Sequence, residues 1–164
     1  METARELIER CRWPDGVACP RCAGQARRLG TSELFQCGDC RAQFSLTAGT
    51  VLEHSRVPLE GWVAAIGSAC LPAGVNAEQV QILTGVTYKS AVSMMRRLRD
   101  ASERAGIGRR SFRLGHQRRL SFAPLPVEEV LRALLQLRPE TSDERLDRAW
   151  AELTGEPEIG RAHV

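Results

Sequence analysis

The sequence lacks a run of about 18 apolar residues, the length that a membrane-spanning helix needs. Its first residues, Met1–Glu6, are charged and lack the apolar region of a signal peptide. Both absences argue against a membrane-bound or exported protein, so we expect a cytoplasmic one. Aromatic residues are few, at 5% of the chain, but the hydrophobic share of 43% is ordinary and favours a folded protein.

Lysine occurs once, as Lys89, so arginine supplies almost all of the 23 basic residues. Arginine suits bidentate contacts with phosphate and guanine, but a GC-rich genome gives the same bias, so this choice carries little weight. The clustering of charge carries more. Residues 86–120 hold ten basic and two acidic residues, a net charge of +8, whereas 1–85 carry −1 and 121–164 carry −4. Such a block predicts a surface that binds a polyanion.

Four of the six cysteines form two C-x-x-C pairs separated by fourteen residues. They are Cys19, Cys22, Cys37 and Cys40. Two such knuckles supply four thiolates to one tetrahedral Zn²⁺ and leave no open coordination position, so we predict one structural zinc ion and no catalytic one. A disulfide framework is the alternative, but it needs an oxidising compartment that nothing in the sequence indicates. Cys11 and Cys70 lie on apolar helical stripes and are typical of buried free thiols, with Cys11 as a spare ligand left open.

Short strands are predicted around the knuckles, at Arg27–Leu29, Leu34–Gln36 and Ala42–Leu46. Three short strands and two knuckles make a zinc ribbon, in which metal binding supplies most of the folding free energy, about 10–16 kcal/mol. Phe35 and Phe44 are expected to cover the metal site. Before the ribbon, Thr3 and Glu6 form a capping box that opens a short helix.

Three further helices are predicted after the ribbon. They are expected at about 59–70, 77–83 and 88–105. Asn76 and Thr87 are suitable N-caps for the last two, and Gly85 lies where the turn between them needs a residue that tolerates positive φ. The apolar positions that match a helix-turn-helix are Val80, Leu83, Val86, Ala91, Met95 and Leu98. The pattern indicates that motif, although a plain helical hairpin with a solvated basic face gives the same spacing.

In a helix-turn-helix the second helix enters the major groove with its N-terminal end. Removing the buried positions leaves one free face, whose residues are the candidates for contacts with base edges: Tyr88, Lys89, Val92, Ser93 and Arg96. The residues better placed for backbone phosphates are Thr87, Ser90, Arg97 and Arg99. Arg109 and Arg110, in the segment that follows, are further candidates for DNA binding.

The rest of the chain divides by composition. Residues 106–123 are basic and contain glycine, which suits either an arm that reaches along a groove or a connector. Beyond them two helices are predicted, one with an apolar stripe over Val127–Leu137 and one capped by Thr141 with Glu144. This pair must bury its stripe on the trihelical unit or on a second copy of the chain. The predicted domains are 1–55 (N-terminal helix and zinc ribbon), 56–105 (helix-turn-helix unit), 106–123 (arm or linker), 124–155 (C-terminal helical pair) and 156–164 (frayed tail).

Several landmark residues surround the knuckles and continue past them. They are Trp13-Pro14-Asp15-Gly16, Cys40–Ser45, Thr47–Val51 and Pro58-Leu59-x-x-Trp62. This pattern resembles the N-terminal zinc ribbon of a group of bacterial insertion-sequence transposases. Gly85–Met95 resembles the helix-turn-helix that follows the ribbon in those proteins. The resemblance covers about residues 2–104 and implies DNA binding.

The chain departs from that family after Arg104. In the family an α/β catalytic domain comes next, with acidic residues that hold divalent metal. Here 60 residues follow, and they predict an arm and two helices. Asp143, Glu144 and Asp147 fall on one helix rather than on separate elements, whereas two-metal chemistry needs carboxylates that converge. We therefore expect no transposase activity and no other enzyme activity.

The predicted fold is mostly α with a small β zinc ribbon, a trihelical helix-turn-helix unit and a C-terminal helical pair. The favoured function is sequence-specific binding of double-stranded DNA at the nucleoid, by a bacterial transcriptional regulator that forms a homodimer through its C-terminal helices. Two alternatives stay open. One is a zinc-ribbon adaptor that docks partners such as the transcription machinery, and the other is a non-catalytic accessory protein of transposition.

Overall fold

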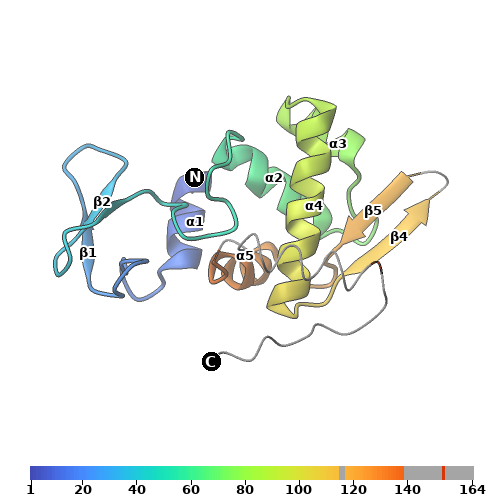
Figure 1. Cartoon of the computed structure of the whole chain (residues 1–164). Coiled ribbons are helices and arrows are strands. Elements are labelled where there is room, and N and C mark those ends of the chain that lie inside the picture. The colour runs from blue at the N-terminus through green and yellow to red at the C-terminus, as the bar shows by residue number, and fades with distance from the viewer. Residues whose placement is uncertain (115–116, 139–152, 154–164) are drawn as a thin grey trace.

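A computed structural model describes residues 1–114, 117–138 and 153 of the chain (Figure 1). This part contains five helices and two small antiparallel sheets. In chain order they are α1 (Ala4–Arg12), β1 (Ala26–Arg28), β2 (Phe35–Cys37), β3 (Gln43–Phe44), α2 (Leu59–Ala69), α3 (Ala77–Thr84), α4 (Tyr88–Ala105), β4 (Arg110–Leu114), β5 (Gln117–Ser121) and α5 (Val127–Leu135). The coarse fold class, helices with a small β ribbon near the N-terminus, is confirmed, whereas the helix-turn-helix arrangement stays a prediction. Of the helices described, none combines the length and apolar character that crossing a bilayer requires.

The ribbon and the second sheet lie at opposite ends of the helical body (Figure 1). In the ribbon, β1, β2 and β3 pair antiparallel in that order, with Arg27 opposite Gln36 and Phe35 opposite Phe44. These strands overlap the three predicted segments. Both knuckles flank the sheet, so the strands fix the distance between the two cysteine pairs.

Local capping determines where the helices begin and end. Thr3 with Glu6 and Asn76 with Gln79 form complete capping boxes, as the sequence indicated for the first pair. The Thr87 side chain accepts a hydrogen bond from the backbone N–H of Ser90 at the start of α4. Gly85 ends α3 with φ of 72°, and Gly106 ends α4 with φ of 65°, a conformation that costs glycine little. The predicted caps of α1, α3 and α4 are therefore confirmed.

The core of the helical body is built around α5, which packs against α1, α2 and α4. Its buried stripe consists of Val130, Leu131, Leu134 and Leu135, which belong to one apolar cluster with Ile8, Trp62, Ile66 and Leu98. The apolar stripe of α5, which was predicted to pack either on the trihelical unit or on a second copy, thus packs within the same chain. It is buried there and is not available to a second copy. The helix predicted at 141–153 lies outside the described residues except for Leu153, so the predicted homodimer stays untested.

Within the predicted arm or linker at 106–123, β4 and β5 form a two-stranded hairpin. β4 and β5 pair antiparallel with Phe112 opposite Arg119 and Arg113 opposite Arg118. The hairpin docks on the connection between α2 and α3 through backbone hydrogen bonds that Val75 and Leu120 exchange, each of 2.9 Å. Its apolar residues near the C-terminal end, which suited either an arm or a connector, join the core.

Gly74 permits the close approach of that hairpin. Its φ is 64°, and a Cβ at this position would lie 2.3 Å from the carbonyl oxygen of Leu120. The buried Arg119 side chain strengthens the same contact, because it donates to the carbonyl oxygens of Ala73 at 2.7 Å and Gly74 at 3.2 Å. The hairpin is therefore held against the helices at its base.

One predicted core position is wrong. Leu83, which the helix-turn-helix spacing placed inside, is 51% exposed, and its neighbour Ile82 is 77% exposed. α3 is short and turns only Val80 fully inward, so its last turn reaches past the neighbouring helices into solvent.

Candidate metal centre and nucleic-acid interface

The four knuckle cysteines converge on one point. Their sulfur atoms all lie within 4.8 Å of one another and form a single metal-binding site. The Sγ atoms of Cys19 and Cys40 are 3.7 Å apart, and those of Cys22 and Cys37 are 3.5 Å apart. All six cysteines are free thiols, which does not support the disulfide alternative.

These spacings fit zinc. Four sulfurs at about 2.3 Å from one tetrahedral ion lie about 3.8 Å from each other, close to both measured separations. The two knuckles also share one backbone geometry, because the residue after the second cysteine of each, Ala23 and Arg41, has a positive φ of 63° and 61°. The residues present therefore suit one structural Zn²⁺ with four thiolate ligands.

Backbone N–H groups point at the sulfurs and favour their charged form. Those of Cys40 and Asp39 donate to the sulfur of Cys37 at 3.5 and 3.4 Å and lower the pKa of this thiol to about 7. The N–H of Gly24 also lowers the pKa of Cys22, but the adjoining sulfurs of Cys37 and Cys40 outweigh it and raise this pKa to about 12. Hydrogen bonding with these sulfurs keeps the proton on Cys22, and a bound dication would favour the thiolate instead.

Three aromatic rings fill the interior of the ribbon. Phe35 and Phe44 are buried and stack with ring centroids 5.8 Å apart. Trp13, just after α1, meets both edge-on at 5.1 and 6.1 Å. This packing joins the metal module to the helix that precedes it, and edge-to-face pairs of this kind contribute about 0.5–1.5 kcal/mol each beyond their burial.

Arg12 makes a second connection between the ribbon and the helices. Its buried guanidinium donates to the carbonyl oxygens of Leu46 and Ala48 and lies 4.4 Å from the ring centre of Trp13. Burial lowers the pKa of Arg12 to about 10, so the side chain stays charged at neutral pH. No sequence pattern marks this residue, since its partners are main-chain groups far along the chain.

The predicted base-contacting residues all lie on α4, near its N-terminal end. Tyr88 is 56% exposed, and Lys89, Ser93 and Arg96 are also exposed, while Val92 is half-buried. The opposite side of the helix is buried through Ala91, Met94, Leu98 and Ala101. One face of α4 is thus fixed in the core and the other faces solvent, as the sequence predicted, and its contact with DNA stays a prediction.

The predicted phosphate contacts divide into two groups. Thr87 and Ser90 share a hydrogen bond of 3.0 Å between their hydroxyl groups at the helix start. Arg97 instead points into the chain, where it donates to the carbonyl oxygens of Val51 at 3.1 Å and Glu53 at 3.3 Å. Its measured contacts tie α4 to the segment after the ribbon, so we leave Arg97 out of the surface proposed below.

Arg109 and Arg110 also have partners within the chain. Arg109 forms an ion pair with Glu103 at 3.0 Å, and Arg110 donates to the carbonyl oxygen of Pro72 at 2.8 Å. Both contacts are on exposed or half-exposed side chains. Such contacts are worth little in water and exchange readily for other partners.

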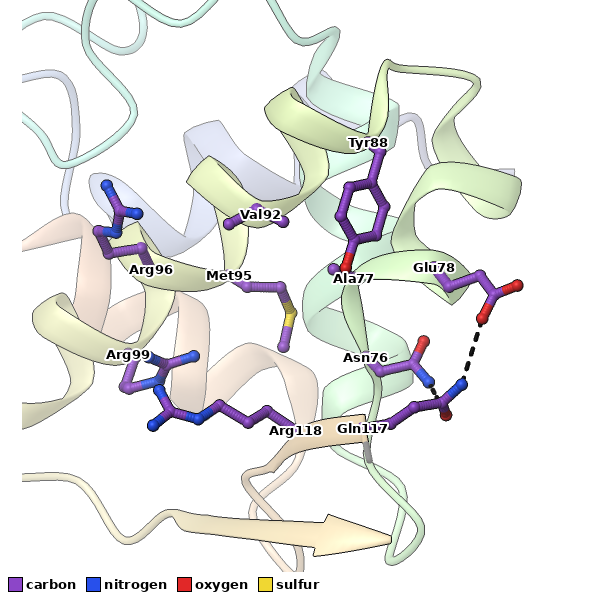
Figure 2. Close-up of a pocket in the computed structure, with 10 residues that line it drawn as sticks. All are labelled: Asn76, Ala77, Glu78, Tyr88, Val92, Met95, Arg96, Arg99, Gln117 and Arg118. Carbon is purple, nitrogen blue, oxygen red and sulfur yellow. Dashed lines mark hydrogen bonds between the residues drawn. The ribbon is translucent and has the colours of Figure 1, made fainter. Parts of the chain in front are cut away.

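A hollow of about 420 Å³ lies beside the open face of α4 (Figure 2). The start of α3 and the first residues of β5 form its other walls. Arg96 and Arg99 reach it from α4 and Arg118 from β5. Arg118 was absent from the predicted contacts, because the sequence did not reveal that 106–123 folds back as a hairpin next to α4.

Comparison with known proteins agrees with this picture at the N-terminus. A relative from Halobacterium salinarum, described as an uncharacterized protein in transposable element ISH50, is 33% identical over 98 residues. That match covers 57% of the chain but only 33% of the relative, so the chain spans about a third of the relative's length. No solved structure matches the chain. The sequence model of the transposase zinc-ribbon domain matches residues 2–43, so this part of the chain is similar to the zinc ribbons of transposases, as the resemblance in the sequence indicated.

Proposed function

We propose that this chain binds double-stranded DNA in a sequence-specific manner, with α3 and α4 as a helix-turn-helix. The observation that carries the proposal is the division of α4 into a buried side and an open side of polar and basic residues that begins at Tyr88. The N-terminal half of such a helix fits the major groove, where Lys89 and Arg96 can reach base edges.

Charge supports the same face. The +8 block of residues 86–120 includes α4 and the hairpin beside it, so its positive charge surrounds the open face. Phosphate contacts give affinity but not sequence preference, so we expect binding to weaken steeply as salt rises.

The zinc ribbon has a supporting role in this proposal. Four thiolates complete the coordination of the ion and leave no position for a reacting water, so we assign no catalytic step to it. Trp13 and Arg12 connect the ribbon to α1, which packs against α2 and α5. The metal therefore holds one end of the body that carries α4.

The biological role that we propose is transcriptional regulation by a protein related to a transposase's recognition region. A second role is favoured by one specific observation, the relative within a transposable element. In that case the chain binds the ends of an element as a non-catalytic accessory of transposition. Genome-wide occupancy separates the two roles, because a regulator is found at scattered promoters and an accessory protein at repeated elements.

DNA binding is tested by selection from random duplexes followed by fluorescence anisotropy on the selected duplex. Lys89→Ala and Arg96→Ala are each expected to weaken binding by about ten- to a hundredfold and to reduce the preference for the selected sequence. Arg27→Ala and Arg56→Ala are matched controls, since each removes one exposed charge that is not on α4. If selection yielded no preferred sequence, or if the controls matched the α4 variants, the proposal would fail.

A further inference from the structure

The hollow beside α4 brings together positive charges from two elements. Arg96 and Arg99 come from α4 and Arg118 from β5, and the guanidinium groups of Arg99 and Arg118 lie next to each other (Figure 2). The guanidinium groups of these three residues form no hydrogen bond or ion pair with the described residues. Like charges held close together cost free energy, which a bound anion would recover.

The electrostatics of Arg99 agree with this arrangement. Burial first, and then the charge of Arg118, lower the pKa of Arg99, and the adjoining Asp100 offsets only part of this. The carboxylate that lines the hollow, Glu78, lies at its other end and accepts a hydrogen bond of 3.2 Å from Gln117. The arginine end of the hollow therefore keeps its positive charge.

The fold holds the backbone at Arg118 in place before any ligand arrives. The next two residues on β5 are fixed, Arg119 by carbonyl oxygens of the α2–α3 connection and Leu120 by its paired hydrogen bonds with Val75. On the other side, Gln117 accepts a hydrogen bond from the Asn76 side chain. Because the backbone is already ordered, only the side chain of Arg118 loses freedom on binding.

We infer that the arginine end of this hollow is a phosphate-binding site, with Arg99 and Arg118 as its donors. The phosphate comes either from the backbone of a nucleic acid strand that passes between α4 and β5, or from a free phosphate compound. The backbone source rests on the proposed function and makes the hairpin a second nucleic-acid-contacting element. Val92 and Met95 give the hollow an apolar wall, which suits the sugar that adjoins a backbone phosphate.

The test compares Arg118→Ala with Arg113→Ala in the full-length, zinc-loaded protein. Arg113 is a matched control because it lies opposite Arg118 in the hairpin and is also exposed, yet it does not line the hollow. One arm measures anisotropy of a labelled duplex across a salt series. The other arm measures the rise in melting temperature caused by inorganic pyrophosphate. Melting of each variant without ligand shows that it folds.

Arg118→Ala is expected to weaken duplex binding by about tenfold and to reduce the salt slope by about one, while Arg113→Ala changes affinity less than about threefold. Pyrophosphate should raise the melting temperature of the wild type and of Arg113→Ala, but not of Arg118→Ala. A specific effect on the duplex supports the backbone source, and an effect on pyrophosphate alone supports a free phosphate compound. Equal effects of the two substitutions, or no effect of Arg118→Ala in either arm, would overturn the site. Failure of the wild type to bind any duplex would instead refute the proposed function and leave the pyrophosphate arm to decide.

Discussion

The backbone N–H of Val75 donates to the carbonyl oxygen of Leu120, and the N–H of Leu120 donates back to Val75, both at 2.9 Å. This exchange of hydrogen bonds attaches β5 to the connection between α2 and α3. It thereby determines where the hairpin lies relative to α4, and the phosphate site proposed above depends on it.

Gly74→Ala should break that attachment. The new Cβ would meet the Leu120 carbonyl oxygen at 2.3 Å and would also force alanine to φ of 64°. We expect a loss of at least about 2 kcal/mol in unfolding free energy, measured by urea denaturation. Gly106→Ala is the control, because it has the same positive φ with nothing within 4 Å, and should cost only about 1 kcal/mol. Equal losses would show that the hairpin is not tightly docked.

Arg12→Met should destabilise the junction between α1 and the ribbon. It leaves the carbonyl oxygens of Leu46 and Ala48 without the charged donor that now binds them in a buried position. We expect a loss of about 2–4 kcal/mol in the free energy of unfolding. Arg28→Met, which removes a surface pair with Glu9, should cost less than about 1 kcal/mol. If both variants lost equal free energy of unfolding, the buried hydrogen bonds of Arg12 would contribute no more to stability than the surface pair of Arg28.

Acidification should remove the contribution of Arg10. Its hydrogen bonds lower the pKa of Glu2 and of Glu128, on α5, below the usual 4.5. A carboxyl group with a lowered pKa in the folded state stabilises the fold above its unfolded pKa, and this contribution is lost as the pH falls through the folded value. Arg10→Met should therefore melt below the wild type near neutral pH, and the gap should close in acid, below about pH 4.5. If Arg10→Met still melted below the wild type in acid, the stabilisation would not come from the hydrogen bonds of Arg10 with Glu2 and Glu128.

Zinc removal should unfold the ribbon while much of the helical body persists. The metal supplies about 10–16 kcal/mol to comparable modules, whereas Trp62 and the α5 stripe are held by burial of apolar side chains. After chelation, amide hydrogens of β1–β3 should exchange rapidly and those of α2 and α5 should stay protected, with weaker DNA binding. Cys70→Ser, outside the site, should respond to the chelator as the wild type does. Unchanged exchange in β1–β3 would show that the four sulfurs hold no structural metal.

The sequence predicted what depends on near neighbours. Several features involve only residues within a few positions of each other: the knuckles at Cys19 and Cys37, the cap at Thr87 and the turn at Gly85. A single sequence is therefore enough to predict them. The hairpin was missed although Gly115, three residues before Arg118, is a turn signal in the sequence. Its docking depends on Gly74 and Val75, whose partners are far along the chain. Arg97 was assigned to phosphate because only the fold brings the carbonyl oxygens of Val51 and Glu53 within its reach.

The same reason explains the error at Leu83 and the open question at α5. Helical spacing marks which residues share a face, but not how far the neighbouring helices extend to cover it. α3 reaches beyond that cover, so Leu83 is exposed, whereas α5 finds its cover within the chain.

The most direct test of DNA binding through α4 is an amide NMR titration of the zinc-loaded protein with its selected duplex. Binding through α4 predicts shifts concentrated at residues 87–99 and 117–119. The buried residues of β1–β3 should not shift. Shifts confined to the ribbon, or no shifts at α4 while the duplex is bound, would show that α4 does not bind the DNA.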